Sequence, residues 1–187
     1  NQLKNVGDVL LATAAIALVR RKYPDASISL LVLPRVAPFF DDHPLLDEVI
    51  PFVYESKGKS FSTMINMVRI VKRKEFDISI SLDYRLRPAI LGFLSGIPCR
   101  IGCEGMDQYR QKPQKVFYRY LFNELYPITN QGHEHQVETF MKAVRPCLGL
   151  PDSAMAMPSL PISKEENKKR VKQILNIVEG VPHKKKI

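Results

Sequence analysis

The sequence has no apolar run long enough to cross a membrane. None of the apolar runs in its 187 residues reaches the ~18 residues that a membrane-spanning helix requires. Cysteine is scarce, and Cys99, Cys103 and Cys147 are odd in number and lack the paired CxxC spacing of zinc sites and disulfide frameworks. The Walker loop and the GxGxxG fingerprint are missing as well. We therefore expect a cytoplasmic chain with reduced thiols that pack as small residues, and no metal site.

The composition is that of an ordinary globular protein, with 45% hydrophobic and 25% charged residues. Its length allows one core, or one core and a tail. The net charge of +9 indicates an anionic partner, which could be a nucleic acid, a phosphorylated sugar or an acidic membrane face. Seven of the positive charges lie between residues 168 and 186, where a solvated face is the simpler interpretation.

Strand-like and helix-like patterns alternate along the chain, which predicts an α/β fold with parallel strands. Residues 1–3 resemble the stub of a first strand, and the aromatic stretch 116–125 fits either a helix or a strand. Pro51 makes the strand around it short or places it at an edge. Further strands are predicted at 28–33, 48–53, 76–82 and 97–102, and helices at 8–22, 35–42, 57–74, 88–94 and 132–148.

For two of these helices, the sequence also predicts which residues face the core or cap the helix. In the helix at 57–74, the period of Phe61, Ile65 and Val68 predicts a core-facing stripe. In the first helix, Asp8 is expected at or beside the N-cap, with Gly7 allowing a sharp turn before it. Spacing leaves two interpretations of Asp8 open. It could be a capping carboxylate, or it could face a substrate hydroxyl, because α/β folds bind ligands at the carboxyl ends of their strands.

Polar residues follow several of the predicted strands and supply further candidates for a site. Lys4, Asn5 and Gly7 precede the first helix and suit an anionic ligand together with its free N–H groups. After the strand at 76–82, Arg85 and Arg87 with Asp83 fit a carboxylate or phosphate, although a solvated arginine pair is the alternative. In a later helix, His135 and Glu138 share one face through their i, i+3 spacing.

The alternation of strand-like and helix-like patterns is interrupted after the strand predicted at 97–102. Residues 104–119 read as an irregular loop in which basic and aromatic residues alternate, a pattern typical of nucleic-acid or membrane-surface patches. No DNA or RNA motif accompanies it, so we expect no nucleic acid. The composition predicts a first domain at 1–150, a proline- and methionine-rich linker at 151–162, and a helix with a basic tail at 163–187.

An ordered series of motifs resembles glycosyltransferase family 9, the lipopolysaccharide heptosyltransferases. The opening stretch Leu3–Leu11 contains the Gly-Asp-Val-Leu core that joins the first strand and first helix of the family. The resemblance covers roughly residues 3–150, and the order of the motifs is more specific than any one of them. The other matching stretches are Arg21–Ala26, Asp47–Phe52, Phe76–Asp83, Leu94–Gly102 and His135–Glu138.

This resemblance implies a GT-B architecture, in which two Rossmann-like domains face each other across a cleft. The chain is similar to the N-terminal, acceptor-binding half, a Rossmann-like parallel sheet flanked by helices. The implied enzyme is inverting and metal-independent, needs no cofactor, and transfers a sugar such as heptose from ADP-heptose to a lipopolysaccharide core acceptor. The nucleotide sugar binds to the C-terminal domain of the family, for which this sequence offers no positions.

The resemblance also implies roles for the candidate residues. Asp8 matches the general base, while Lys4, Asn5, Gly7, Asp83, Arg85 and Arg87 would contact the acceptor. His135 and Glu138 match the His-x-Val-Glu positions, for which we favour an orienting or domain-contact role over catalysis. A lipid-linked saccharide acceptor implies peripheral contact with the cytoplasmic face of the inner membrane. The rival hypothesis is a stand-alone basic α/β module that binds a nucleotide or nucleic acid without catalysis.

Overall fold

The computed structural model describes residues 6–52, 60–82, 86–104, 119–127 and 135–160 of the chain. The predicted first-strand stub at 1–3 and the helix and tail predicted at 163–187 lie outside the described residues. None of the described helices is long and apolar enough to cross a membrane.

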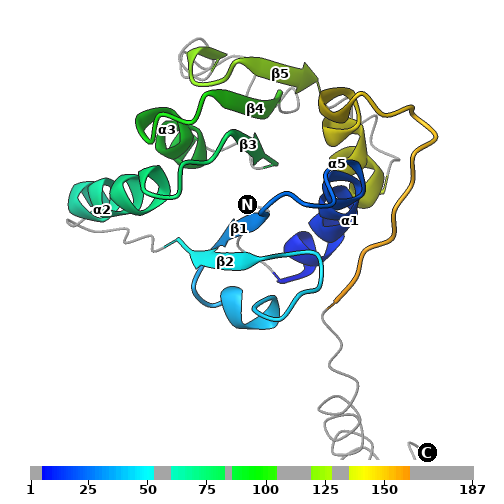
Figure 1. Ribbon diagram of the computed structural model, residues 1–187, viewed down its shortest axis with the longest axis horizontal. Helices are drawn as coiled ribbons and strands as arrows, with labels where there is room; N and C mark the ends of the chain where they lie inside the picture. Colours follow the sequence, from blue (N-terminus) through cyan, green and yellow to red (C-terminus); the bar gives the residue numbers. More distant parts are fainter. Residues whose placement is uncertain (1–5, 53–59, 83–85, 105–118, 128–134, 161–187) are drawn as a thin grey trace, which may run out of the picture.

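The described strands form two parallel sheets. Strand β1 pairs with β2, with Ser29 opposite Glu48. Strand β4 lies between β3 and β5, with Ile78 opposite Cys99 and Ile101 opposite Glu124. Figure 1 shows the two sheets one above the other, in the order β5, β4, β3, β1, β2. The strands are β1 Ser29–Val32, β2 Glu48–Pro51, β3 Ile78–Ser81, β4 Cys99–Glu104 and β5 Glu124–Pro127.

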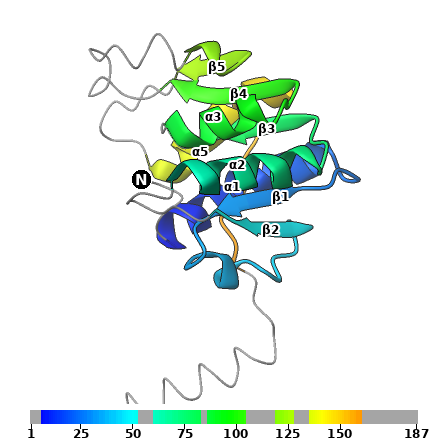
Figure 2. The same cartoon turned by 90° about the vertical axis from the view of Figure 1, so that its left-hand side faces the viewer.

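Helices cover both sides of the strand layer. Helices α1 and α5 lie side by side on one side, and α2 and α3 lie on the other (Figure 1). The view of Figure 2 looks onto the α2–α3 side, with the strands behind. This arrangement confirms the predicted α/β class with parallel strands flanked by helices. The helices are α1 Val6–Lys22, α2 Ser60–Lys72, α3 Leu86–Leu94 and α5 Gln136–Val144, with short 3-10 helices η2 Ala37–Phe39 and η4 Pro146–Leu148.

The two helix layers have different apolar cores. Between α1 and α5, small side chains of α1 meet larger side chains of α5, which lets the two helix backbones approach closely. This cluster contains Ala12, Ala14, Ala15, Leu18, Phe140, Met141 and Val144, all at most 3% exposed. The core under α2 and α3 contains Ile50, Met67, Val71, Leu91 and Ile97. Each layer therefore buries its own stripe against the strands.

Two expectations for helices α1 and α2 are wrong. Helix α1 already begins at Val6, so Gly7 and Asp8 are part of its first turn. Gly7 does not have a positive φ, and no sharp turn occurs at it. Phe61 is 79% exposed, because the buried stripe of α2 is centred on Met67 and Val71 and leaves the first turn uncovered.

The remaining element boundaries differ by a few residues from those predicted. The predicted helix at 35–42 contracts to the 3-10 helix η2, and the strand predicted at 97–102 begins and ends two residues later. The ambiguous stretch 116–125 leads into strand β5, whose register is set by pairing with β4. Gly149 adopts the left-handed conformation, with a φ of 59°, and ends η4.

Gly102 in strand β4 allows a test of how tightly the sheet packs against the Phe122 ring. A Cβ atom added there would lie 2.9 Å from three atoms of the Phe122 ring, which is itself buried. We expect Gly102→Ala to lower the free energy of unfolding by about 1–3 kcal/mol, because the ring has to move within a packed core. Urea unfolding measures the change.

Gly92 in helix α3 provides the matched control. A Cβ atom there would approach the Ser79 Oγ atom at 3.3 Å, and this hydroxyl can rotate away. Alanine is also the better helix former, by about 1 kcal/mol. Equal destabilisation by Gly92→Ala and Gly102→Ala would contradict the steric explanation.

Candidate functional site

The candidate site lies where the helices begin. Helix α3 follows the carboxyl end of β3, and α5 follows the carboxyl end of β5, so both start at one edge of their parallel sheet. Helix α1 packs beside α5, and Leu82, which follows β3, contacts the same apolar cluster. Figure 2 shows the first turn of α1, in the darkest blue, on the left, where α5 also begins. Three helix N-termini thus share this edge, and their dipoles favour an anionic ligand.

Asp8 lies in the first turn of α1 and is half-buried. Gly7 precedes it and is exposed, and a Cβ atom added to Gly7 would meet no atom of the described residues within 4 Å. Within the described part of the chain, this side of the turn is therefore not covered by a neighbouring group. Lys4 and Asn5, predicted for the same anion site, lie outside the described residues.

Arg87 is the described member of the second predicted group. It lies in the first turn of α3 and is half-buried. Asp83 and Arg85 lie outside the described residues, so their predicted acceptor contact stays a prediction. The structure thus places one arginine of the predicted pair at the start of a helix that begins at the sheet edge.

His135 caps helix α5. Its backbone is extended, and its Nδ1 atom accepts a hydrogen bond from the Val137 N–H at 3.4 Å. The ring is exposed, and capping leaves Nε2 as the nitrogen that can meet a ligand. Sequence reasoning placed His135 inside a longer helix at 132–148, whereas the structure makes it the boundary residue.

Glu138 forms an ion pair with Arg145, a residue that the sequence analysis did not single out. The Arg145 Nη1 atom donates to Glu138 Oε1 at 2.6 Å, and Nη2 donates to Oε2 at 3.3 Å. Arg145 is 1% exposed, whereas the side chain of Glu138 is 29% exposed. The seven-residue separation, two helical turns, is the signal that could have revealed this pair. Glu138 therefore has a structural partner whatever else it contacts.

The thiols of the described part lie away from the helix starts. Burial raises the pKa of the Cys147 thiol to about 12, and desolvation likewise raises the pKa of Cys99. A hydrogen bond from the Tyr126 hydroxyl to Glu124 raises the pKa of that hydroxyl too. Such thiols are poor nucleophiles, as expected for packing residues. Within the described residues, no cluster of His, Cys, Asp and Glu side chains could hold a metal ion.

The ion pair predicts an asymmetric effect of its two partners on stability. Glu138→Gln leaves a nearly fully buried guanidinium without an anion, and we expect a loss of about 3 kcal/mol in the free energy of unfolding. Arg145→Met leaves a carboxylate that water can reach, so its cost should be smaller. Urea unfolding of both variants measures the difference. Unchanged stability of Glu138→Gln would show that the carboxylate is free for a ligand.

The chain is similar in sequence to lipopolysaccharide heptosyltransferases. It is 25% identical over 125 residues to lipopolysaccharide heptosyltransferase 3 of Escherichia coli, a match that covers 65% of this chain and 35% of that protein. The corresponding enzyme of strain K12 is 24% identical over 148 residues, covering 78% of this chain and 40% of the enzyme. The chain thus spans well under half the length of these curated relatives. No family model matches the sequence.

Solved structures share the fold. The glycosyl transferase family 9 protein from Veillonella parvula DSM 2008 aligns with a TM-score of 0.75 and 18% identity, covering 96% of this chain and 48% of that one. The ADP-heptose heptosyltransferase II of E. coli aligns with a TM-score of 0.70 and 19% identity, covering 91% and 48%. Sequence and fold agree: the chain is heptosyltransferase-like, similar to glycosyltransferases of family 9 over about half of their length.

Proposed function

We propose that this chain is the acceptor-binding half of a glycosyltransferase that transfers a sugar, heptose from ADP-heptose, to a lipopolysaccharide core acceptor. The observation that carries the proposal is the position of Asp8 in the first turn of α1, which packs beside α5 and begins at the same edge. The similarity to heptosyltransferases, over 40% of one curated enzyme and 48% of a solved one, supports it. We assign nucleotide-sugar binding to the part of those enzymes that this chain does not match.

Asp8 is proposed as the general base of an inverting, metal-independent transfer. The dipole of α1 favours a negative charge in the first turn, which is the form that accepts a proton. A carboxylate is in general a weak base. The attacking hydroxyl becomes acidic as its bond to the anomeric carbon forms, so a well-placed weak base can accept the proton late. The aspartate carboxylate takes the proton, and the nucleoside diphosphate leaves with the electron pair of the broken bond.

The acceptor is proposed to lie across the starts of α1, α3 and α5. Arg87 would contact a carboxylate or phosphate of the acceptor, together with Lys4, Asn5, Asp83 and Arg85. His135 would contribute its free Nε2 atom. The net charge of +9 supports an acidic acceptor and peripheral contact with the cytoplasmic face of the inner membrane. The proposed division is an acceptor domain at 1–150, a linker at 151–162 and a following segment at 163–187.

Substitution of Asp8 tests the mechanism in an intact enzyme that contains this chain. We expect Asp8→Asn to reduce turnover by about 10²–10⁴, because general-base assistance is lost. Asn is similar in size and polar, so the fold and the acceptor affinity should change little. Transfer assays with saturating donor give the rate, and acceptor titration gives the affinity. Wild-type turnover in the variant would show that Asp8 only interacts with the helix dipole.

Calorimetric titration of the 187-residue chain tests the assignment of halves. We expect weak binding of an anionic core saccharide, no binding of ADP or ADP-heptose, and no transfer, because catalysis requires both substrates to be held together. Tight binding of ADP would place a donor site within these residues and reverse the assignment. Tight binding of an oligonucleotide instead would favour the rival binding module.

A further inference from the structure

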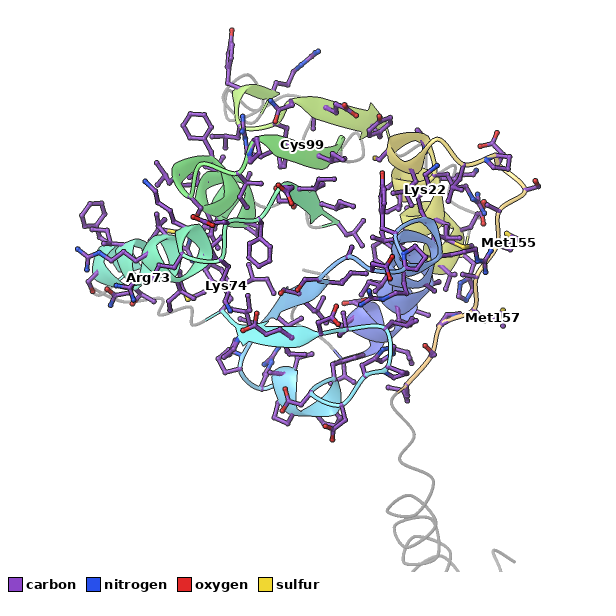
Figure 3. All side chains as sticks on the ribbon, viewed as in Figure 1. Lys22, Arg73, Lys74, Cys99, Met155 and Met157 are labelled. Atoms are coloured by element: carbon purple, nitrogen blue, oxygen red, sulfur yellow. The ribbon has the colours of Figure 1, made fainter. Side chains whose placement is uncertain are left out.

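Residues 151–160, predicted as a linker, follow the surface of α5 and α1 in the structure. The segment contains no helix or strand. Ala156 is nevertheless only 8% exposed and belongs to the apolar cluster between α1 and α5, with Ala154 packed beside it. In Figure 3, Met155 and Met157 lie along this segment, on the outer side of the helix pair. A stretch without periodicity is therefore part of the core.

The first end of the segment is bonded to Arg145. The Nε atom of this buried guanidinium donates to the Ala154 carbonyl at 2.7 Å, and Nη2 donates to the Met155 Sδ atom at 3.0 Å. The Leu150 N–H donates to the Arg145 carbonyl at 3.0 Å. Arg145 therefore joins the segment to Glu138 and so to the first turn of α5.

The second end is bonded to α1 and to the turn after η2. The Ser159 N–H donates to Thr13 Oγ1 at 2.8 Å, and the Thr13 hydroxyl donates to the Leu10 carbonyl at 2.6 Å. The His43 Nε2 atom lies 2.8 Å from the Ser159 carbonyl. The Leu45 N–H donates to His43 Nδ1, so Nδ1 is the acceptor and we assign the proton to Nε2.

These contacts use polar groups that are expensive to bury alone. Thr13 is 0% exposed and His43 is 2% exposed. If Ser159 moved away, the buried Thr13 and His43 side chains would each lose a hydrogen bond. This loss raises the free energy of any state in which the segment is detached. Ser159 alone satisfies both groups, because its N–H donates to Thr13 and its C=O accepts from His43.

We propose that residues 151–160 form a fixed strap, clasped at one end by Arg145 and at the other by Thr13 and His43. The strap holds α1 and α5 together from outside, because Ala156 belongs to the cluster between the two helices and the ends of the strap bond to Arg145 and Thr13. Resting on the proposed function, it follows that residues 151–160 move with the acceptor-binding half in any rotation against a donor-binding half.

Amide hydrogen exchange on the 187-residue chain tests the strap. The Ser159 amide should be protected, whereas the Met157 amide, which makes no hydrogen bond within the described part of the chain, should exchange faster. We expect Thr13→Val to accelerate exchange at Ser159 about tenfold, because the acceptor of its hydrogen bond is removed. Thr13→Ser keeps the hydroxyl and should restore the protection.

Thr139 offers a matched control. It is also a fully buried threonine in the α1–α5 layer, but its hydroxyl has no hydrogen-bond partner among the described residues. Thr139→Val should leave exchange at Ser159 unchanged. Equal acceleration by both valine variants, or no protection of Ser159 in the wild-type chain, would overturn the proposal.

A second variant covers the case in which Thr13→Val does not fold. Ser159→Pro removes the backbone N–H from outside the core, and it should accelerate exchange of the Ala154 amide, which donates to the Pro151 carbonyl, while the amides of α2 stay protected. Unchanged exchange at Ala154 would overturn the strap. None of these measurements needs a donor or an acceptor, so a failed strap and a failed enzymatic assignment give different results.

Discussion

The close packing of α1 against α5 is the contact on which the rest of the structure depends. Alanines of α1 present little more than a methyl group each, so the bulkier Phe140 and Met141 fill the space between the helices without a void. Because α1 runs beside α5, the first turns of both helices lie at one edge of the structure. The position of Asp8 relative to His135 is thus a consequence of small residues about one to two helical turns away.

Polar groups around this helix pair explain why an irregular segment is ordered. Arg145, Thr13 and His43 are buried, and each uses a backbone atom of residues 151–160 as a partner. A buried polar group without a partner costs about 1–3 kcal/mol, which is comparable to the entropy gained when a few residues are released. Segment and helix pair therefore stabilise each other.

The candidate residues at the sheet edge fall into two groups, those whose position suits a ligand and one whose carboxylate already binds Arg145. Asp8, Arg87 and His135 lie in or beside first helical turns, where dipoles and accessible N–H groups suit an anionic acceptor. Glu138 also lies in a first turn, but its carboxylate holds Arg145. The ion pair links Glu138 to residues 151–160, because Arg145 also donates to the Ala154 carbonyl.

The sequence by itself determined the α/β class, the parallel strands and the approximate positions of the helices, but not the residues at which α1 and α5 begin. Local patterns suffice for these features, because strand alternation, helical period and the αL conformation of Gly149 depend on neighbouring residues. Only the tertiary structure decided that Arg145 bonds to the Ala154 carbonyl and that Ser159 bonds to Thr13 and His43. Ser159 and Thr13 are 146 residues apart, and no periodicity connects two positions whose contact arises from the packing of α1 beside a returning segment.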